Sequence, residues 1–194
     1  MLYEGINRYR FDKVAFQYAQ KNYDLFMDDW RINQHNNEQY HAWGGNGGGD
    51  KHYTWGTLLC LVALEQYIDQ NPWEGLRFGT SDPPAAGEFR GAIWANHIYD
   101  ITIGPQRTAL KRDGRIRFEA NGAVVVRQYE PKASRLSFAL KGERPVQVTT
   151  AEFDSGEVSL RIDGRAAGKV GIARGLGRFD VPSGEHIVEL VKEP

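Results

Sequence analysis

A short polar segment between residues 36 and 43 holds the residues best suited to chemistry. It reads Asn-Asn-Glu-Gln-Tyr-His-Ala-Trp, with Glu38 as its one carboxylate, and a glycine-rich run from Gly44 to Gly49 follows it. Sugars present hydroxyl groups to amides and carboxylates and C–H faces to aromatic rings, so this composition is typical of a sugar site. The competing interpretation is a solvated glutamate just past a helix end.

Two other chemistries are disfavoured by the spacing of the residues. A phosphate-binding loop needs a strand before it and Lys followed by Ser or Thr after its last glycine, whereas Asp50 follows Gly49 here. Three histidines, His35, His41 and His52, are separated by six and eleven positions, which matches no common zinc-ligand spacing. We therefore predict no metal and no cofactor.

Two helices are predicted to flank this polar segment. Apolar residues recur every three or four positions from Phe11 to Trp30 along two stripes, so this helix is expected to be packed on two sides. A second helix is expected from near His52 to about Asp69, apolar all round and stopped by Pro72. Because two helices cannot cover such a helix on every side, we expect its packing partners to lie elsewhere.

The second part of the chain is predicted to be β-structure. Turn signals separate alternating segments at Asp113-Gly114, Asn121-Gly122, Asp163-Gly164 and Pro182-Ser183-Gly184, and each predicts a hairpin. Short strands with turns at this spacing indicate a small antiparallel sandwich or barrel. The predicted organisation is a helical part over residues 1–74, a Gly- and Pro-containing linker over 75–94, and a β-sandwich over 95–194.

Charge and composition restrict the partners of the protein. The 194 residues carry 24 basic and 25 acidic side chains, a net charge of −1, so neither nucleic acid nor a polybasic attachment to a membrane is expected. No signal peptide precedes the first charged residues, and no apolar run approaches the roughly 20 residues that span a bilayer. The single cysteine, Cys60, fits an inert core thiol in a reducing compartment, so we expect a cytoplasmic protein.

The residues from Ala15 to Asp69 resemble the last two helices of the (α/α)6 toroid of glycoside hydrolases related to family 63. That group includes processing α-glucosidases and mannosylglycerate hydrolases, with trehalases as more distant relatives. The resemblance is carried by a Glu-x-Tyr loop, a glycine-rich segment and an opening to the final helix, which stand here as Glu38-Gln39-Tyr40, Gly44 to Asp50 and His52-Tyr53-Thr54-Trp55-Gly56. Residues 88–127 resemble the β-rich tail that often follows the toroid.

The resemblance implies an α+β fold, with the last two toroid helices followed by a small antiparallel β-sandwich. It also implies an inverting mechanism in which one carboxylate activates water and a second carboxylic acid protonates the glycosidic oxygen. By this match Glu38 is the general base, and the acid lies upstream of the matched helices. The implied substrate-binding residues are Tyr40, Trp43, His52, Tyr53 and Trp55.

Three hypotheses about function remain open. A toroid of twelve helices needs on the order of 300 residues, so the chain is expected to be the C-terminal portion of an α-glycosidase, inactive without an upstream portion or partner chain. The alternatives are a non-catalytic carbohydrate-binding module, with Trp43 and Trp55 as stacking platforms, and a scaffold or interaction subunit. The first and last predict an exposed apolar patch on the helices of residues 11–31 and 52–69.

Overall fold

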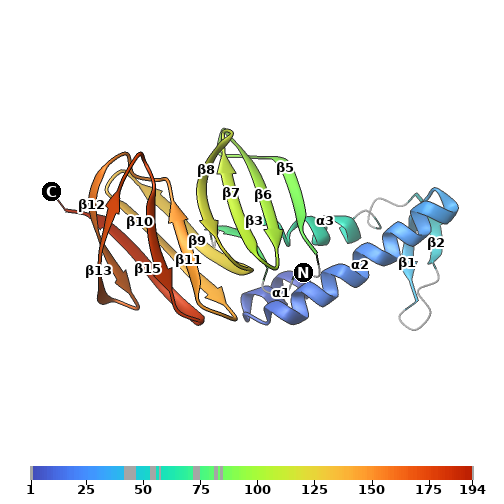
Figure 1. The fold of residues 1–194 in the computed structure, drawn as a ribbon. Helices are drawn as coiled ribbons and strands as arrows, with labels where there is room; N and C mark the ends of the chain where they lie inside the picture. The colour runs from blue at the N-terminus through green and yellow to red at the C-terminus, as the bar shows by residue number, and fades with distance from the viewer. Residues whose placement is uncertain are drawn as a thin grey trace. The chain divides into compact units, whose positions relative to one another are not determined.

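The computed structural model describes residues 2–41, 47–52, 56, 58–71, 75–80, 83 and 85–193. The chain divides into two compact units, Met1–Gln66 and Tyr67–Pro194. Strands make up 55% of the described residues and helices 21%. Figure 1 shows the helices confined to the first unit and most strands in the second. Among the described residues, no helix is both long and apolar enough to cross a membrane.

The first unit is built around one long helix, as the periodicity predicts. Helix α2 (Asp12–Asn33) packs against α1 (Leu2–Arg8) and α3 (Leu58–Leu64), with Ala15 and Ala19 fully buried. The helix ends where Gln34 adopts a left-handed conformation and donates its backbone N–H to the carbonyl of Trp30 at 3.0 Å. The two-stranded sheet of β1 (Asn37–Tyr40) and β2 (Gly47–Lys51) follows α2.

The second predicted helix is much shorter than expected. Helix α3 contains only seven residues and buries none of them, and residues 68–71 form strand β3 (Ile68–Asn71) instead of continuing it. The sheet satisfies the backbone polar groups that a longer helix would have satisfied. Ile68 pairs with Phe78 of β4 (Gly75–Phe78), and the Gly79 N–H donates to the carbonyl of Tyr67 at 3.1 Å.

Two antiparallel sheets form the second unit. Over the described residues, the seven-stranded sheet has the order β13 (Arg165–Ile172), β12 (Gly156–Ile162), β15 (Gly184–Lys192), β10 (Arg135–Gly142), β9 (Val124–Lys132), β4 and β3. The six-stranded sheet has the order β14 (Gly177–Val181), β11 (Val146–Thr150), β8 (Arg115–Ala120), β7 (Arg107–Arg112), β6 (His97–Gly104) and β5 (Gly87–Trp94). Strands β4 and β5 occupy much of the range expected to be a linker.

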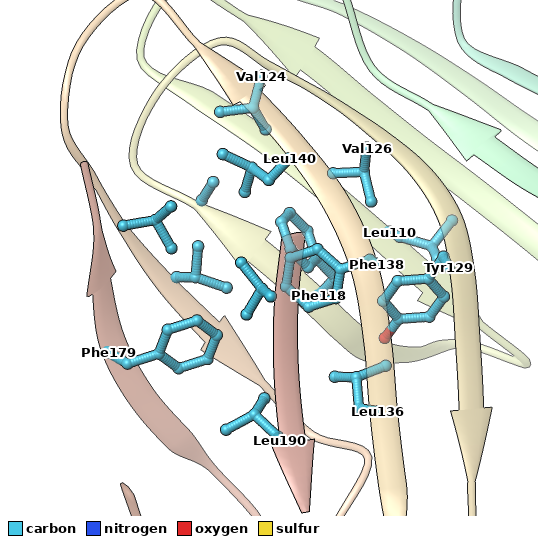
Figure 2. Close-up of a cluster of buried hydrophobic side chains, with 14 of the residues drawn as sticks. Leu110, Phe118, Val124, Val126, Tyr129, Leu136, Phe138, Leu140, Phe179 and Leu190 are labelled. Carbon is cyan, nitrogen blue, oxygen red and sulfur yellow. The ribbon is translucent and has the colours of Figure 1, made fainter. Parts of the chain in front are cut away.

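Aromatic rings from both sheets meet in the core of this unit. Phe118 of the six-stranded sheet packs edge to face against Phe78 and Phe138 of the other sheet, with ring centroids 5.2 and 5.6 Å apart. Figure 2 shows Phe118, Phe138 and Tyr129 surrounded by buried leucines and valines. Alternating residues on each strand supply this layer, because successive side chains of a strand point to opposite faces.

The predicted toroid is therefore wrong. Three antiparallel sheets dominate the structure, in place of two toroid helices followed by a small sandwich. The physical reason is the apolar surface that neighbouring elements can cover. The alternating apolar residues of the second unit bury one another between two sheets, whereas α3 leaves Leu58 and Leu61 53% and 47% exposed.

Two of the four predicted hairpins are confirmed. Asp113-Gly114 joins β7 to β8 and Asp163-Gly164 joins β12 to β13, in each case between hydrogen-bonded neighbours with positive φ at both turn residues. The hairpin predicted at Asn121-Gly122 is wrong, because β8 and β9 belong to different sheets. The Pro182-Ser183-Gly184 turn likewise connects β14 of one sheet to β15 of the other.

Candidate functional site

The predicted catalytic residue, Glu38, lies at an irregularity in the β1–β2 hairpin. Asn37 pairs with Lys51 and Gln39 pairs with Gly48, so two residues of β2, Gly49 and Asp50, stand opposite the single residue Glu38. This arrangement is a β-bulge, a feature that changes the direction of a side chain and recurs beside active sites. The bulge is possible because Gly49 adopts a φ of +77°.

The carboxylate of Glu38 lies directly over this glycine. The backbone N–H of Asp50 is 3.4 Å from Glu38 Oε2, and a Cβ atom added at position 49 would lie 2.5 Å from the same oxygen. Glycine is thus required at position 49 both by its backbone conformation and by the close approach of the carboxylate. The remaining surface of Glu38 is exposed to solvent.

Buried amides attach this hairpin to the long helix. The side chain of Asn37, which is buried, donates to the carboxylate of Asp29 on α2. The backbone N–H of Asn37 lies 3.3 Å from the hydroxyl oxygen of Tyr40, which accepts it. Burial raises the pKa of Tyr40, and the carboxylate of Asp29 raises it further, against the lowering effect of the Asn37 N–H. The Tyr40 hydroxyl therefore faces the hairpin itself and holds its shape.

His52 lies just after β2 and is exposed. Its backbone N–H donates to the carbonyl of the buried Asn36 at 2.8 Å, and its ring meets the edge of His35 with centroids 5.7 Å apart. Strand β1 and the residue after β2 thus carry Glu38, Tyr40 and His52 on one hairpin. The other predicted substrate-binding residues, Trp43, Tyr53 and Trp55, lie outside the described residues, so their roles stay predictions.

The chemistry that this hairpin supports is that of a solvated carboxylate among amides. Glu38 accepts a hydrogen bond from a backbone amide and keeps the rest of its surface in water. An ionised carboxylate can accept a proton from water or from a sugar hydroxyl. Within the described part of the chain, no group of three His, Cys, Asp or Glu residues could hold a metal ion.

A second polar cluster, which the sequence did not predict, lines a cleft in the second unit. The cleft has a volume of about 500 Å³ and takes its walls from strands of both sheets. At its floor the side chain of Glu152 is only 4% exposed, and it accepts hydrogen bonds from Arg112 Nη2 at 3.0 Å and from the Tyr129 hydroxyl at 2.9 Å. Arg117 Nη1 lies 3.8 Å from the same carboxylate.

Aromatic side chains form the mouth of this cleft. Trp94, at the end of β5, is 40% exposed, and its ring lies 6.2 Å from that of the buried Tyr99 at a tilt of 31°. Burial raises the pKa of Tyr129 well above its ordinary value, so its hydroxyl stays protonated and donates to Glu152. The cluster was missed because Arg112 and Glu152 are 40 positions apart. The one local sign of this cleft in the sequence is Trp94, which lies at the tip of the β5–β6 hairpin.

Comparisons of this chain with family models, with curated proteins and with solved structures find no match.

Proposed function

We propose that this chain supplies the general base, Glu38, of an inverting glycoside hydrolase that acts on α-glycosides. The observation that supports the proposal is the Glu38 carboxylate held over Gly49 at the bulge and exposed in an amide-rich hairpin. The resemblance of the sequence motif over residues 38–56 to that of such enzymes is the second support, although the toroid fold that it implied is wrong. The balanced charge and the single cysteine support a cytoplasmic location.

In this proposal Glu38 takes a proton from a water molecule. The water oxygen then attacks the anomeric carbon on the face opposite the leaving group, and a general acid donates a proton to the departing glycosidic oxygen. The two carboxyl groups stand about 6.5–9.5 Å apart in enzymes of this type, which leaves room for the water. His52 is proposed to contact the sugar, whereas Tyr40 contributes through its ring, because its hydroxyl accepts the Asn37 N–H.

The general acid is proposed to come from another polypeptide segment or from a partner chain. The exposed leucines of α3 support such a partner, because Leu58, Leu61 and Leu64 follow one another at a spacing of three and are 53%, 47% and 38% exposed. An apolar surface of this kind is typical of a protein contact. The same observation favours the second candidate function, an interaction or scaffold module.

A substrate that needs no acid catalysis tests the base by itself. Fluoride leaves an α-glycosyl fluoride without being protonated, so the chain alone is expected to accelerate its hydrolysis. We expect Glu38→Gln to reduce the rate by about 10²–10⁴-fold, the usual contribution of a general base. Glu143→Gln changes an exposed glutamate in the second unit and is the matched control. Equal rates for the wild-type protein and Glu38→Gln would remove Glu38 from the mechanism.

The interaction module is tested by association rather than by turnover. If a partner protein binds to the exposed leucines of α3, Leu61→Glu should abolish binding of that partner. The variant should keep the fold of the chain, because Leu61 is exposed. If α3 instead mediates self-association, the same variant should shift the sedimentation of the wild-type protein toward the monomer. Sedimentation velocity over a range of concentrations distinguishes the two outcomes.

A further inference from the structure

The cleft in the second unit has a composition suited to a ligand with both an apolar face and an anionic group. Its volume of about 500 Å³ falls in the range of small-molecule sites, which combine aromatic walls with a few placed polar groups. All the described residues that line it belong to the second unit, so the cleft is formed within that unit.

The charges in this cleft leave a positive excess. The lining includes three basic side chains, Arg112, Arg117 and Lys132, against two acidic ones, Glu130 and Glu152. At the exposed rim Lys132 and Glu130 pair with each other at 3.4 Å. On the floor two guanidinium groups share one buried carboxylate, so these three side chains together carry a net charge of +1 where water is partly excluded. The neighbouring carboxylate of Asp113 is paired with His97.

The buried carboxylate has a positioning role in this arrangement. Glu152 accepts from Arg112 Nη2 and from the Tyr129 hydroxyl, and Arg117 Nη1 also donates to the backbone carbonyl of Ala151 at 3.0 Å. The guanidinium groups are thereby held in place while 19% and 25% of their side chains stay exposed. A guanidinium presents a planar set of donors that matches a carboxylate in two parallel hydrogen bonds.

The aromatic mouth supplies the complementary surface for a sugar ring. Trp94 is 40% exposed and packs against Tyr99, which also meets the edge of His97 with centroids 6.3 Å apart. His97 is itself paired with Asp113, with Nδ1 and Oδ2 2.7 Å apart. An indole ring supported from behind in this way offers a flat face to the C–H groups of a sugar.

We propose that this cleft binds an acidic oligosaccharide, with a uronic-acid carboxylate on Arg112 and Arg117 and a sugar ring on Trp94. The ligand carboxylate would neutralise the excess charge that Glu152 leaves. A neutral sugar would gain the stacking contact but not the ion pair in which a carboxylate accepts two parallel hydrogen bonds from a guanidinium.

Titration calorimetry of the full chain with oligogalacturonate, hyaluronan and alginate oligosaccharides tests this proposal. At low ionic strength at least one of these oligosaccharides is expected to bind. Its methyl ester keeps the sugar rings but lacks the negative charge, so the ester should bind about tenfold more weakly. Added salt should weaken the acidic ligand more than the ester. Equal affinity of acid and ester, or no binding by any of the three, overturns the proposal.

Variants then locate the bound ligand. Trp94→Ala is expected to weaken binding about tenfold, since stacking is worth roughly one to two kcal/mol with its buried area. Trp30→Ala is the matched control, because Trp30 is 43% exposed but lies on α2 in the other unit. Glu38→Gln should bind as the wild-type protein does, so failure of the proposed hydrolase and failure of this site are distinguishable. Undiminished binding by Trp94→Ala would place the ligand elsewhere and overturn the assignment.

Discussion

The ring of His186 is held against the carboxylate of Asp163, with Nδ1 and Oδ2 2.8 Å apart. The same relationship recurs between His97 and Asp113 at 2.7 Å. In both cases the aspartate is the first residue of an Asp-Gly turn. Its Oδ1 accepts a hydrogen bond from the backbone N–H of the residue that follows the histidine, which is Ile187 at 2.9 Å in the first case and Ile98 at 3.0 Å in the second. Each motif thus joins a hairpin turn to the strand beside it.

The His186 motif predicts a particular dependence of stability on pH. The hydrogen bond to Asp163, with help from the carbonyl of Ser183, raises the pKa of His186. Donation by His186 and by the Ile187 N–H lowers the pKa of Asp163. The histidine contribution is fully present below its unfolded pKa of about 6.5 and is lost as pH rises through the raised folded value. The aspartate contribution is present above about 3.9 and is lost as pH falls through the lowered folded value.

The midpoint of thermal unfolding measured as a function of pH checks this expectation. The stabilisation from the pair should be greatest between about pH 4 and pH 6.5. His186→Gln should lower the midpoint in that window and converge on the wild-type curve at alkaline pH. His41→Gln changes an exposed histidine in the other unit and serves as the control. A constant difference between wild type and His186→Gln at every pH would contradict the assignment.

The aromatic core predicts a large loss of stability on truncation. Phe118 is fully buried and meets Phe78 and Phe138 edge to face, so Phe118→Ala should lower the free energy of unfolding by about 3–5 kcal/mol. Phe11→Ala removes a ring that is 61% exposed and should change it by no more than about 0.5 kcal/mol. Urea denaturation measures both values, and comparable losses in the two variants would contradict the central place of Phe118 in the core.

The close approach at the bulge predicts that Gly49→Ala disturbs Glu38. The added methyl group would meet the carboxylate, and alanine would also be strained at a φ of +77°. Hydrolysis of the α-glycosyl fluoride is expected to fall as Glu38 moves. Gly91→Ala is the matched control, because Gly91 has a φ of +79° but nothing within 4 Å of the added methyl group. A similar fall in both variants would point to general backbone strain instead of loss of the carboxylate position.

The buried carboxylate of the cleft predicts a sharp difference between two substitutions. Glu152→Ala leaves the half-buried Arg112 and Arg117 without their shared carboxylate and leaves the Tyr129 hydroxyl with the more distant carbonyl of Arg117, 3.3 Å away, at a cost of about 3–5 kcal/mol. Glu152→Gln keeps an oxygen for Tyr129 and should cost less. Chemical denaturation compares the two variants, with the exposed Glu143→Ala as the control. Equal losses for Glu152→Ala and Glu152→Gln would show that the hydrogen bond to Tyr129 contributes little.

Local patterns in the sequence were sufficient for features that depend on near neighbours. The repeat of three and four predicts α2, because helical backbone geometry brings those positions to one face. The Asp-Gly pairs at 113 and 163 predict their hairpins, because the two turn residues alone determine the positive φ values. The proximity of Glu38 to the glycine run is of the same kind, since the two strands are adjacent in the chain. The catalytic role of Glu38 stays a prediction.

Tertiary structure alone decided which segments pair and what they bury. Asn121-Gly122 carries the same local signal as the true hairpin turns, yet it joins two sheets, because β8 pairs with β11 while β9 pairs with β10. The apolar run from residue 52 to 69, expected to form one helix, contributes to both α3 and β3. Its last residues, 68 and 69, belong to β3 and pair with β4. The cluster of Arg112 and Glu152 at the cleft floor brings together two residues 40 positions apart, for which no local pattern carries information.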